Sequence, residues 1–281
     1  MEFGASIFFT DYSISPTELA TAMEERGLDA LWAAEHSHIP VPRRTPAPGG
    51  GELPKRYYDV MDPFVTLAAA APVTKRLKLG TGVCLVIQRD TIQTAKLVAS
   101  IDQISNGRFL FGIGGGWNAE EIENHGTEFT SRFKKMREQI EAMKEIWTKS
   151  TAEYHGDIVN FSPMMTWPKP VQRPHPPVIL GGAFPWAARR AVRYGDGWYP
   201  NASSGDLREY LPRFRQMAEE AGRDPQSLPV TLGGAPEDPD TLKRYRDLGV
   251  VRVNFPVPPA KADEVLPILD RVAKLKQQVG G

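Results

Sequence analysis

The sequence predicts a single-domain α/β protein, a (β/α)8 barrel of the TIM type with insertions after its second and fourth strands. Three observations support this prediction. Strand-like apolar runs alternate with helical patterns along the chain, and eight such strand–helix units can be counted. The strands lack the polar alternation of a half-exposed sheet, which is typical of parallel strands covered on both faces. A chain of 281 residues, 41% of them hydrophobic, has the size of one such barrel.

The elements follow one another in a regular order. Residues 16–26 are predicted to form the first helix, because Ser15 can cap it, proline suits its first position and Gly27 can end it. Further helices are expected at residues 63–71, 91–104, 131–149 and 261–279. The strands are expected at residues 3–9, 29–34, 77–87, 109–113, 178–180, 197–200, 230–232 and 250–255.

Two long segments interrupt this alternation within the single domain, residues 1–281. Residues 38–59, after the second strand, are far longer than an ordinary strand–helix connection, and loops of this length are commonly lids or binding loops. Residues 152–177 begin with a hairpin pattern, EYHGDIVNF, and end in a proline-rich approach to the fifth strand. Because the loops at the carboxyl ends of barrel strands build the active site, the lid-like loop is expected to border it.

Composition excludes several classes of function. The 34 Lys and Arg residues balance 34 Asp and Glu residues, so no bulk charge favours nucleic acid or an anionic membrane as a partner. The single cysteine, Cys84, forms no disulfide framework and is expected to be buried in a strand. The sequence starts without a basic signal region, and no apolar run approaches the roughly 20 residues that span a bilayer. A cytoplasmic protein is therefore expected.

Two glycine-rich turns follow predicted strands. Gly114, Gly115 and Gly116 separate a buried strand from a helix start, in GRFLFGIGGGWNAEE, and Trp117 comes next. This is not the G-x-G-x-x-G dinucleotide motif. The second turn, Gly181, Gly182, Ala183 and Phe184, also precedes a helix. Free N–H groups at a helix start suit a phosphate, so both turns are predicted to hold a cofactor; the alternative is that the glycines only turn the chain.

Polar side chains follow the second strand, in LWAAEHSHIP. Glu35 and His36 are candidates for acid–base chemistry, because a carboxylate beside a histidine can orient and tune a proton donor. His38 lies two residues later, but two histidines without a partner carboxylate are no metal motif, and no metal site is predicted. The other histidines, His125, His155 and His175, are interpreted as structural.

Basic residues fall in two further places. Arg43, Arg44, Lys55 and Arg56 make the lid-like loop basic and could meet an acidic cofactor or substrate. Arg189 and Arg190, farther along the helix after the second glycine turn, are expected to be solvated or paired.

Taken together, these motifs resemble the bacterial luciferase-like family, and in particular its oxidoreductases that depend on the deazaflavin coenzyme F-420. The resemblance covers roughly the first 200 residues in family order. It rests on Trp32 with Glu35 and His36, and on LGTGV, ISNGRFLFGIGGGW, PKPVQRPHPPVILGG and AARRAVRYGDGWYP.

The resemblance implies where a cofactor would lie. The planar ring would rest against a bulge at Gly82 and Val83, joined by a cis peptide, and Glu35 would approach it with His36 as a proton donor. The phosphate arm would lie near Gly116 and Trp117 and near residues 181–183. Family members that oxidise sugar phosphates carry glutamate where this chain has Trp117, which argues against that substrate class.

Two enzyme functions and one binding function fit these motifs. The leading hypothesis is hydride transfer between coenzyme F-420 and a small organic substrate. The alternative is a monooxygenase that uses flavin mononucleotide (FMN), reduced by a separate reductase. A non-catalytic flavin- or deazaflavin-binding barrel is the third interpretation, and the resemblance favours a homodimer in each case.

Overall fold

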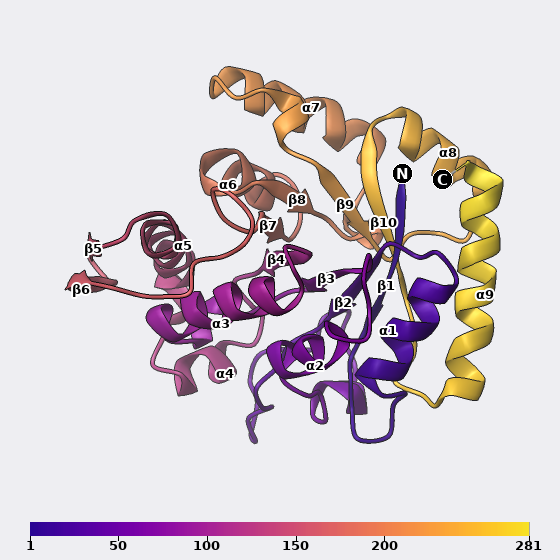
Figure 1. Ribbon diagram of the computed structural model, residues 1–281, viewed down its shortest axis with the longest axis horizontal. Coiled ribbons are helices and arrows are strands. Elements are labelled where there is room, and N and C mark those ends of the chain that lie inside the picture. Colours follow the sequence, from indigo (N-terminus) through magenta and orange to yellow (C-terminus); the bar gives the residue numbers. More distant parts are fainter. Residues whose placement is uncertain (281) are drawn as a thin grey trace.

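The computed structural model describes residues 1–280, which form a closed barrel of eight parallel strands surrounded by helices (Figure 1). The spatial order is β1-β10-β9-β8-β7-β4-β3-β2, so each strand pairs with its neighbours in the chain order predicted from the sequence. The barrel strands are β1 (Glu2–Ile7), β2 (Ala30–Ala33), β3 (Lys78–Thr81), β4 (Phe109–Ile113), β7 (Val178–Gly181), β8 (Gly197–Tyr199), β9 (Val230–Gly233) and β10 (Val250–Pro256).

Helices cover the outside of the barrel, as the apolar character of both strand faces requires. The α-helices are α1 (Pro16–Glu25), α2 (Pro63–Ala70), α3 (Thr91–Ile104), α4 (Ala119–Asn124), α5 (Arg132–Thr148), α6 (Trp186–Tyr194), α7 (Leu207–Glu220), α8 (Pro239–Asp247) and α9 (Ala262–Val279). Short 3-10 turns are η1 (Lys55–Tyr57), η2 (Val86–Gln88), η3 (Phe129–Ser131), η4 (Ala202–Ser204) and η5 (Pro225–Ser227). The side chain of Ser15 caps α1 as predicted, accepting a hydrogen bond from Glu18 N.

One predicted strand is shorter than expected. The sequence predicted a strand over residues 77–87, but β3 ends at Thr81. The chain leaves the sheet at the Gly82–Val83 peptide, returns for a single bridge between Cys84 and Ile113, and then forms η2. The apolar run continues past the strand because its later residues are buried outside the sheet, and Cys84 is fully buried as expected.

The segment before β7 contains the predicted hairpin, β5 (Ala152–His155) and β6 (Asn160–Met164), paired antiparallel. It lies outside the barrel next to α5 (Figure 1). Residues 38–59 form an irregular loop with the short turn η1 near its end. No helix within residues 1–280 has the length and apolar character that crossing a membrane requires.

Candidate active site at the barrel mouth

A cavity of about 470 Å³ opens where the carboxyl ends of four barrel strands meet. Gly82, just past β3, and Ala34, just past β2, form part of its wall, and Arg56 reaches it from the loop 38–59. The remaining wall residues are Ser6, Ile7, Phe8 and residues 256–259. This is the end of the barrel at which (β/α)8 enzymes carry their active sites.

Val83 links the two glycine turns. The Gly82–Val83 peptide is cis, which confirms the expectation for this bulge. A Cβ atom on Gly114 would lie 2.7 Å from Val83 Cγ2, and one on Gly181 would lie 2.8 Å from Val83 Cγ1. The Val83 side chain therefore fills the space that side chains at these two positions would need. Packing explains these two glycines, whereas Gly116, with φ of 64°, adopts a conformation that favours glycine.

Backbone N–H groups of both turns are free of protein acceptors. Within residues 1–280, no acceptor bonds to the N–H groups of Gly115, Gly116, Trp117, Ala183 or Phe184. The first three precede α4 and the last two precede α6, so both sets lie at the positive end of a helix. The arrangement can bind an anion from two sides.

Asn118 can add to this cradle, whereas the N–H group of Gly182 is already used within the protein. Asn118 is 1% exposed, yet neither polar atom of its amide has a partner among the described residues. A buried polar group without a partner costs about 1–3 kcal/mol, so a ligand that bonds to it would recover that energy. Gly182 has φ of 128° and donates its N–H to the carbonyl of Tyr199 over 3.1 Å.

His36 is held between a carboxylate and an indole. Its Nδ1 lies 2.7 Å from Oε2 of Glu121, a side chain with no exposed surface, and its Nε2 accepts a hydrogen bond of 3.3 Å from Trp117 Nε1. We assign the ring proton to Nδ1, because Nε2 acts as an acceptor and a carboxylate only accepts. The ring of Tyr57, from η1, lies 5.1 Å from that of His36.

Glu121 is also bonded on its other oxygen. Oε1 accepts a hydrogen bond of 2.9 Å from Ser37 N, and Ser37 Oγ lies 2.7 Å from Nε2 of the exposed His125. Burial alone would raise the pKa of Glu121, but the hydrogen bonds from His36 and Ser37 outweigh it and hold the pKa below its ordinary value. His38 Nδ1 also contacts Ser37 Oγ, at 2.9 Å. His125, which the sequence suggested was merely structural, thus ends a hydrogen-bonded chain from the surface to Glu121.

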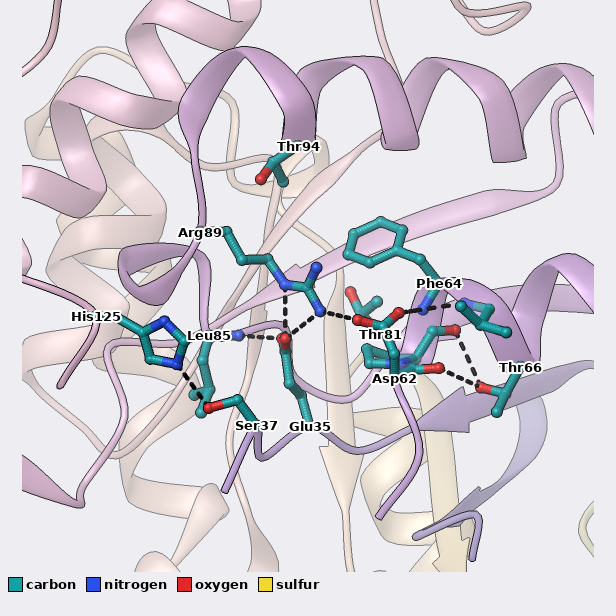
Figure 2. A network of polar contacts seen from close by, with 12 residues as sticks. Glu35, Ser37, Asp62, Phe64, Thr66, Thr81, Leu85, Arg89, Thr94 and His125 are labelled. Atoms are coloured by element: carbon teal, nitrogen blue, oxygen red, sulfur yellow. Dashed lines mark hydrogen bonds and ion pairs between the residues drawn. The ribbon is translucent and has the colours of Figure 1, made fainter. Parts of the chain in front are cut away.

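Glu35 has a different environment from the one expected. Its carboxylate accepts hydrogen bonds of 2.6 Å from Leu85 N and from Arg89 Nε, and Arg89 also forms an ion pair with Asp62 (Figure 2). The side chain of Glu35 is 5% exposed and is not part of the cavity wall. Both oxygens accept hydrogen bonds, so Glu35 joins the end of β2 to the chain after β3.

Two of the four basic residues of the loop are paired with acidic side chains. Arg44 pairs with Glu120 and Glu123 of α4, and Lys55 pairs with Asp59. Two other loop cations lie over aromatic rings. Arg43 lies 5.3 Å from the centre of the Trp117 ring, and Arg56 lies 5.4 Å from that of Phe8. The loop therefore covers the first glycine turn but offers less free positive charge than its sequence suggested.

The sequence model of the luciferase-like monooxygenase family matches residues 15–236. The chain belongs to this family. An uncharacterized protein of Mycobacterium tuberculosis is 39% identical over 281 residues, which cover 97% of this chain and 98% of the relative. An F-420-dependent glucose-6-phosphate dehydrogenase of Amycolatopsis mediterranei is 29% identical over 224 residues, which cover 76% of this chain and 62% of the relative.

Solved structures show the same luciferase-like fold. A monooxygenase from Streptomyces bottropensis superposes with a TM-score of 0.79 at 20% identity, with full coverage of both chains. An F-420-dependent secondary alcohol dehydrogenase, solved with an F-420–acetone adduct, superposes with a TM-score of 0.76 at 16% identity, covering 99% of this chain and 98% of the other. The luciferase-like relatives thus include F-420-dependent oxidoreductases and monooxygenases.

Sequence reasoning identified part of this luciferase-like site and missed part of it. His36, Trp117 and the two glycine turns were named, and the structure brings them to one end of the barrel. Glu121 and Tyr57 were not named as site residues. The acids after Trp117 were noticed, but a helix start accounts for acids in that position, and only the fold shows that one of them contacts His36.

Proposed function

We propose that this luciferase-like oxidoreductase transfers hydride between coenzyme F-420 and a small organic substrate, with His36 as the proton-exchanging residue. The observation that carries the proposal is the buried His36–Glu121 pair beside two turns with free N–H groups. The pair offers a place to hold a proton, and the turns offer a place to hold a phosphate. His36 contacts Trp117 of the first turn, and Val83 packs against a glycine of each turn, so the pair and the two turns are linked at one end of the barrel.

The residues present fit a phosphorylated flavin or deazaflavin. The N–H groups of Gly115, Gly116 and Trp117 would face the phosphate arm from one side, and those of Ala183 and Phe184 from the other. The segment Gly82–Val83 would form the surface against which the planar ring rests, because Gly82 is part of the wall of the mouth cavity.

The deazaflavin, when bound, supplies hydride chemistry that is nearly inert to oxygen. His36 supplies the proton that accompanies it. With Nδ1–H held by Glu121, His36 exchanges a proton only at Nε2, and the carboxylate stabilises the doubly protonated ring. Trp117 Nε1 donates a hydrogen bond of 3.3 Å to Nε2 of His36, and this bond must break when a substrate group approaches Nε2. The exposed end of the chain, His125, gives Glu121 a hydrogen-bonded connection to solvent through Ser37.

Two comparisons bear on the choice of cofactor. The F-420-dependent relative aligns with 76% of the chain, whereas an FMNH2-dependent dimethylsulfone monooxygenase of Pseudomonas putida aligns with 39% of it at 36% identity. The longer alignment favours F-420, and the higher local identity keeps an FMN-dependent monooxygenase with a partner reductase as the second candidate. Because the family resemblance implies that sugar-phosphate dehydrogenases carry glutamate at the position of Trp117, we propose a substrate other than a sugar phosphate.

The cofactor test is a titration of purified protein with F-420 and with FMN, followed by absorbance and fluorescence. We expect saturable binding of F-420, at least as tight as that of FMN, and reduction of bound F-420 by members of a panel of small alcohols and aldehydes. Tighter binding of FMN, with oxygen consumption after addition of reduced FMN, would replace the proposal with the monooxygenase. Binding of either cofactor without turnover of any panel member, in the presence or absence of oxygen, would favour a cofactor-binding protein.

A further inference from the structure

A groove of about 600 Å³ lies between α5 and α6, outside the barrel and apart from the mouth cavity. Its wall carries five basic side chains and a single acidic one. The basic residues are Lys134, Arg137, Arg189, Arg190 and Arg193. The other wall residues are Phe133, Asp157, Trp186 and Tyr194. We call this the arginine groove.

Most of the positive charge in the arginine groove is uncompensated. Asp157, the one acid of the wall, forms an ion pair with Lys134, and Arg137 forms ion pairs with Glu138 and Glu141 outside the wall. Within residues 1–280, no ion pair links Arg189, Arg190 or Arg193 to a carboxylate, which leaves three of the five cations uncompensated. Arg189 and Arg190 were expected to be solvated or paired; Arg189 is exposed, whereas Arg190 is partly buried and has no ion-pair partner among the described residues.

Buried polar atoms without partners gather at the same place. Tyr194 is 7% exposed, and its hydroxyl has no hydrogen-bond partner among the described residues. The Nε atoms of Arg190 and the adjacent Arg132 are buried and also have no hydrogen-bond partner, whereas Nε of Arg137 forms an ion pair with Glu141 at 3.7 Å. Native proteins leave few such groups unsatisfied, and three of them around one groove indicate a ligand that accepts hydrogen bonds. Burial lowers the pKa of Arg190, and burial with the nearby Arg190 lowers that of Arg132, so an anion would relieve both effects.

Two aromatic rings fix the orientation of the guanidinium groups. Arg190 lies 3.9 Å from the centre of the Phe133 ring, and Arg189 lies 5.1 Å from that of Trp186. Stacked guanidinium groups are ordered before a ligand arrives, and their paired donors match the oxygens of a carboxylate or a phosphate. Several such groups along one helix suit a chain of anionic groups better than a single ion.

The arginine groove begins beside the phosphate cradle. A Cβ atom on Gly115 would lie 2.4 Å from the Phe133 ring, so Phe133 separates the first glycine turn from the groove. Trp186 comes two residues after Phe184 of the second turn. A ligand held by both turns and extending outward would reach the groove first.

We propose that the arginine groove binds a linear polyanion whose carboxylate or phosphate groups are spaced along a flexible chain. The site lies outside the reaction centre and acts whichever cofactor occupies the cradle. Its assignment to the acidic tail of F-420 rests on the proposed function, since FMN ends at its phosphate. Electrostatic attraction of this kind weakens as salt concentration rises.

The test is isothermal titration calorimetry of the full chain, at low and at high salt, with inorganic tripolyphosphate and with a γ-linked tetraglutamate as separate ligands. The variant is Arg189→Gln with Arg193→Gln, both exposed, and the control is Arg271→Gln with Lys274→Gln on α9, which removes the same charge elsewhere. We expect one site per chain and a loss of about tenfold or more in the groove variant, because hydrogen bonds to charged groups are strong. The control should remain within about twofold, since charges beyond a Debye length are screened.

The outcomes distinguish the arginine groove from the proposed function. Tighter binding of tetraglutamate identifies carboxylates as the groups that the groove recognises, and tighter binding of tripolyphosphate identifies phosphates. If neither ligand shows saturable binding, or if the groove variant and the control lose affinity equally, the arginine groove is not a binding site. If both ligands bind but F-420 does not, the groove stands and the proposed function fails. If F-420 binds equally to wild type and groove variant, and the two anions do not bind, the proposed function stands and the groove fails.

Discussion

His36 and Glu121 share a buried hydrogen bond of 2.7 Å, although 85 positions separate them in the chain. The contact joins the end of β2 to the first turn of α4, across the start of the loop 38–59 and beside the first glycine turn. Because Glu121 fixes the proton on Nδ1, Nε2 of His36 is the ring nitrogen left for a reaction. The predictions below begin with this pair.

Glu121→Gln should lower turnover by about 10²-fold, the lower end of the contribution of a general acid. The amide keeps the shape of the side chain but no longer stabilises a doubly protonated His36. Glu121→Gln combined with His36→Gln should cost little more turnover than His36→Gln alone, which a purely structural role of Glu121 would not produce. Glu123→Gln, an exposed neighbour on α4, is the matched control and should leave turnover unchanged.

The same carboxylate should make stability depend on pH. The pKa of Glu121 is lower in the folded protein than in the unfolded chain, so ionised Glu121 contributes stability above the unfolded pKa. This contribution should disappear as the pH falls through the folded pKa. Urea unfolding from pH 7 to pH 3 should show wild type losing its advantage over Glu121→Gln below about pH 4.5. A difference that is constant over this range would contradict the assignment.

His36→Ala should reduce turnover by about 10² to 10⁴-fold and leave cofactor affinity within a few-fold, because a proton donor acts on the reaction and not on cofactor binding. The substitution also removes a partner of buried Glu121, so a thermal melt must accompany the kinetics. His36→Gln, which retains hydrogen-bonding atoms, should restore stability without restoring turnover. Full activity in both variants would assign the proton to another group, and His38→Ala measures the contribution of the neighbouring imidazole.

Ala183→Glu should abolish cofactor binding without unfolding the protein. Ala183 is exposed and lies in the second glycine turn, so a carboxylate there would repel a phosphate held by the neighbouring N–H groups. Ala183→Gln has nearly the same size without the charge and should weaken binding far less. Fluorescence titration of both variants measures the difference, and equal affinities would show that the phosphate does not lie at this turn.

Gly114→Ala should destabilise the fold by about 1–3 kcal/mol, because the added methyl group overlaps Val83. Combining it with Val83→Ala should recover part of the loss, since the smaller side chain makes room. Urea unfolding of the two single variants and the double variant gives the coupling energy, expected at about 0.5–3 kcal/mol for residues in contact. Strictly additive effects would mean that the overlap is relieved elsewhere.

Local patterns were enough to predict the eight strands, the hairpin and both glycine turns, because periodicity, turn residues and helix caps act over a few positions. The end of β3 was misplaced, since the apolar run from Leu77 to Ile87 continues in a buried loop. An apolar run of this kind predicts that its residues are buried, but it does not predict that they pair with a neighbouring strand.

The site shows the corresponding limit of local patterns. His36 and Trp117 were recognised within motifs. The partners of nearby charged residues could not be recognised in this way, because they lie in segments distant in the sequence. Glu35 was predicted to tune His36 because the two residues are adjacent in the sequence, but its partner is Arg89, which lies 54 positions away. The charges of the loop 38–59 likewise looked free until the fold placed α4 beside them. Charge compensation is a property of tertiary structure.

The position of Val83 between the two glycine turns has a consequence for the evolution of this protein. A side chain at Gly114 or Gly181 would overlap Val83 while Val83 retains both methyl groups, since the added carbons would lie 2.7 and 2.8 Å from them. The three sites should therefore covary among homologues: an alanine or serine at either glycine should appear with a smaller residue in place of Val83. In lineages that gained a side chain at position 114 or 181, the substitution of Val83 by a smaller residue should have come first.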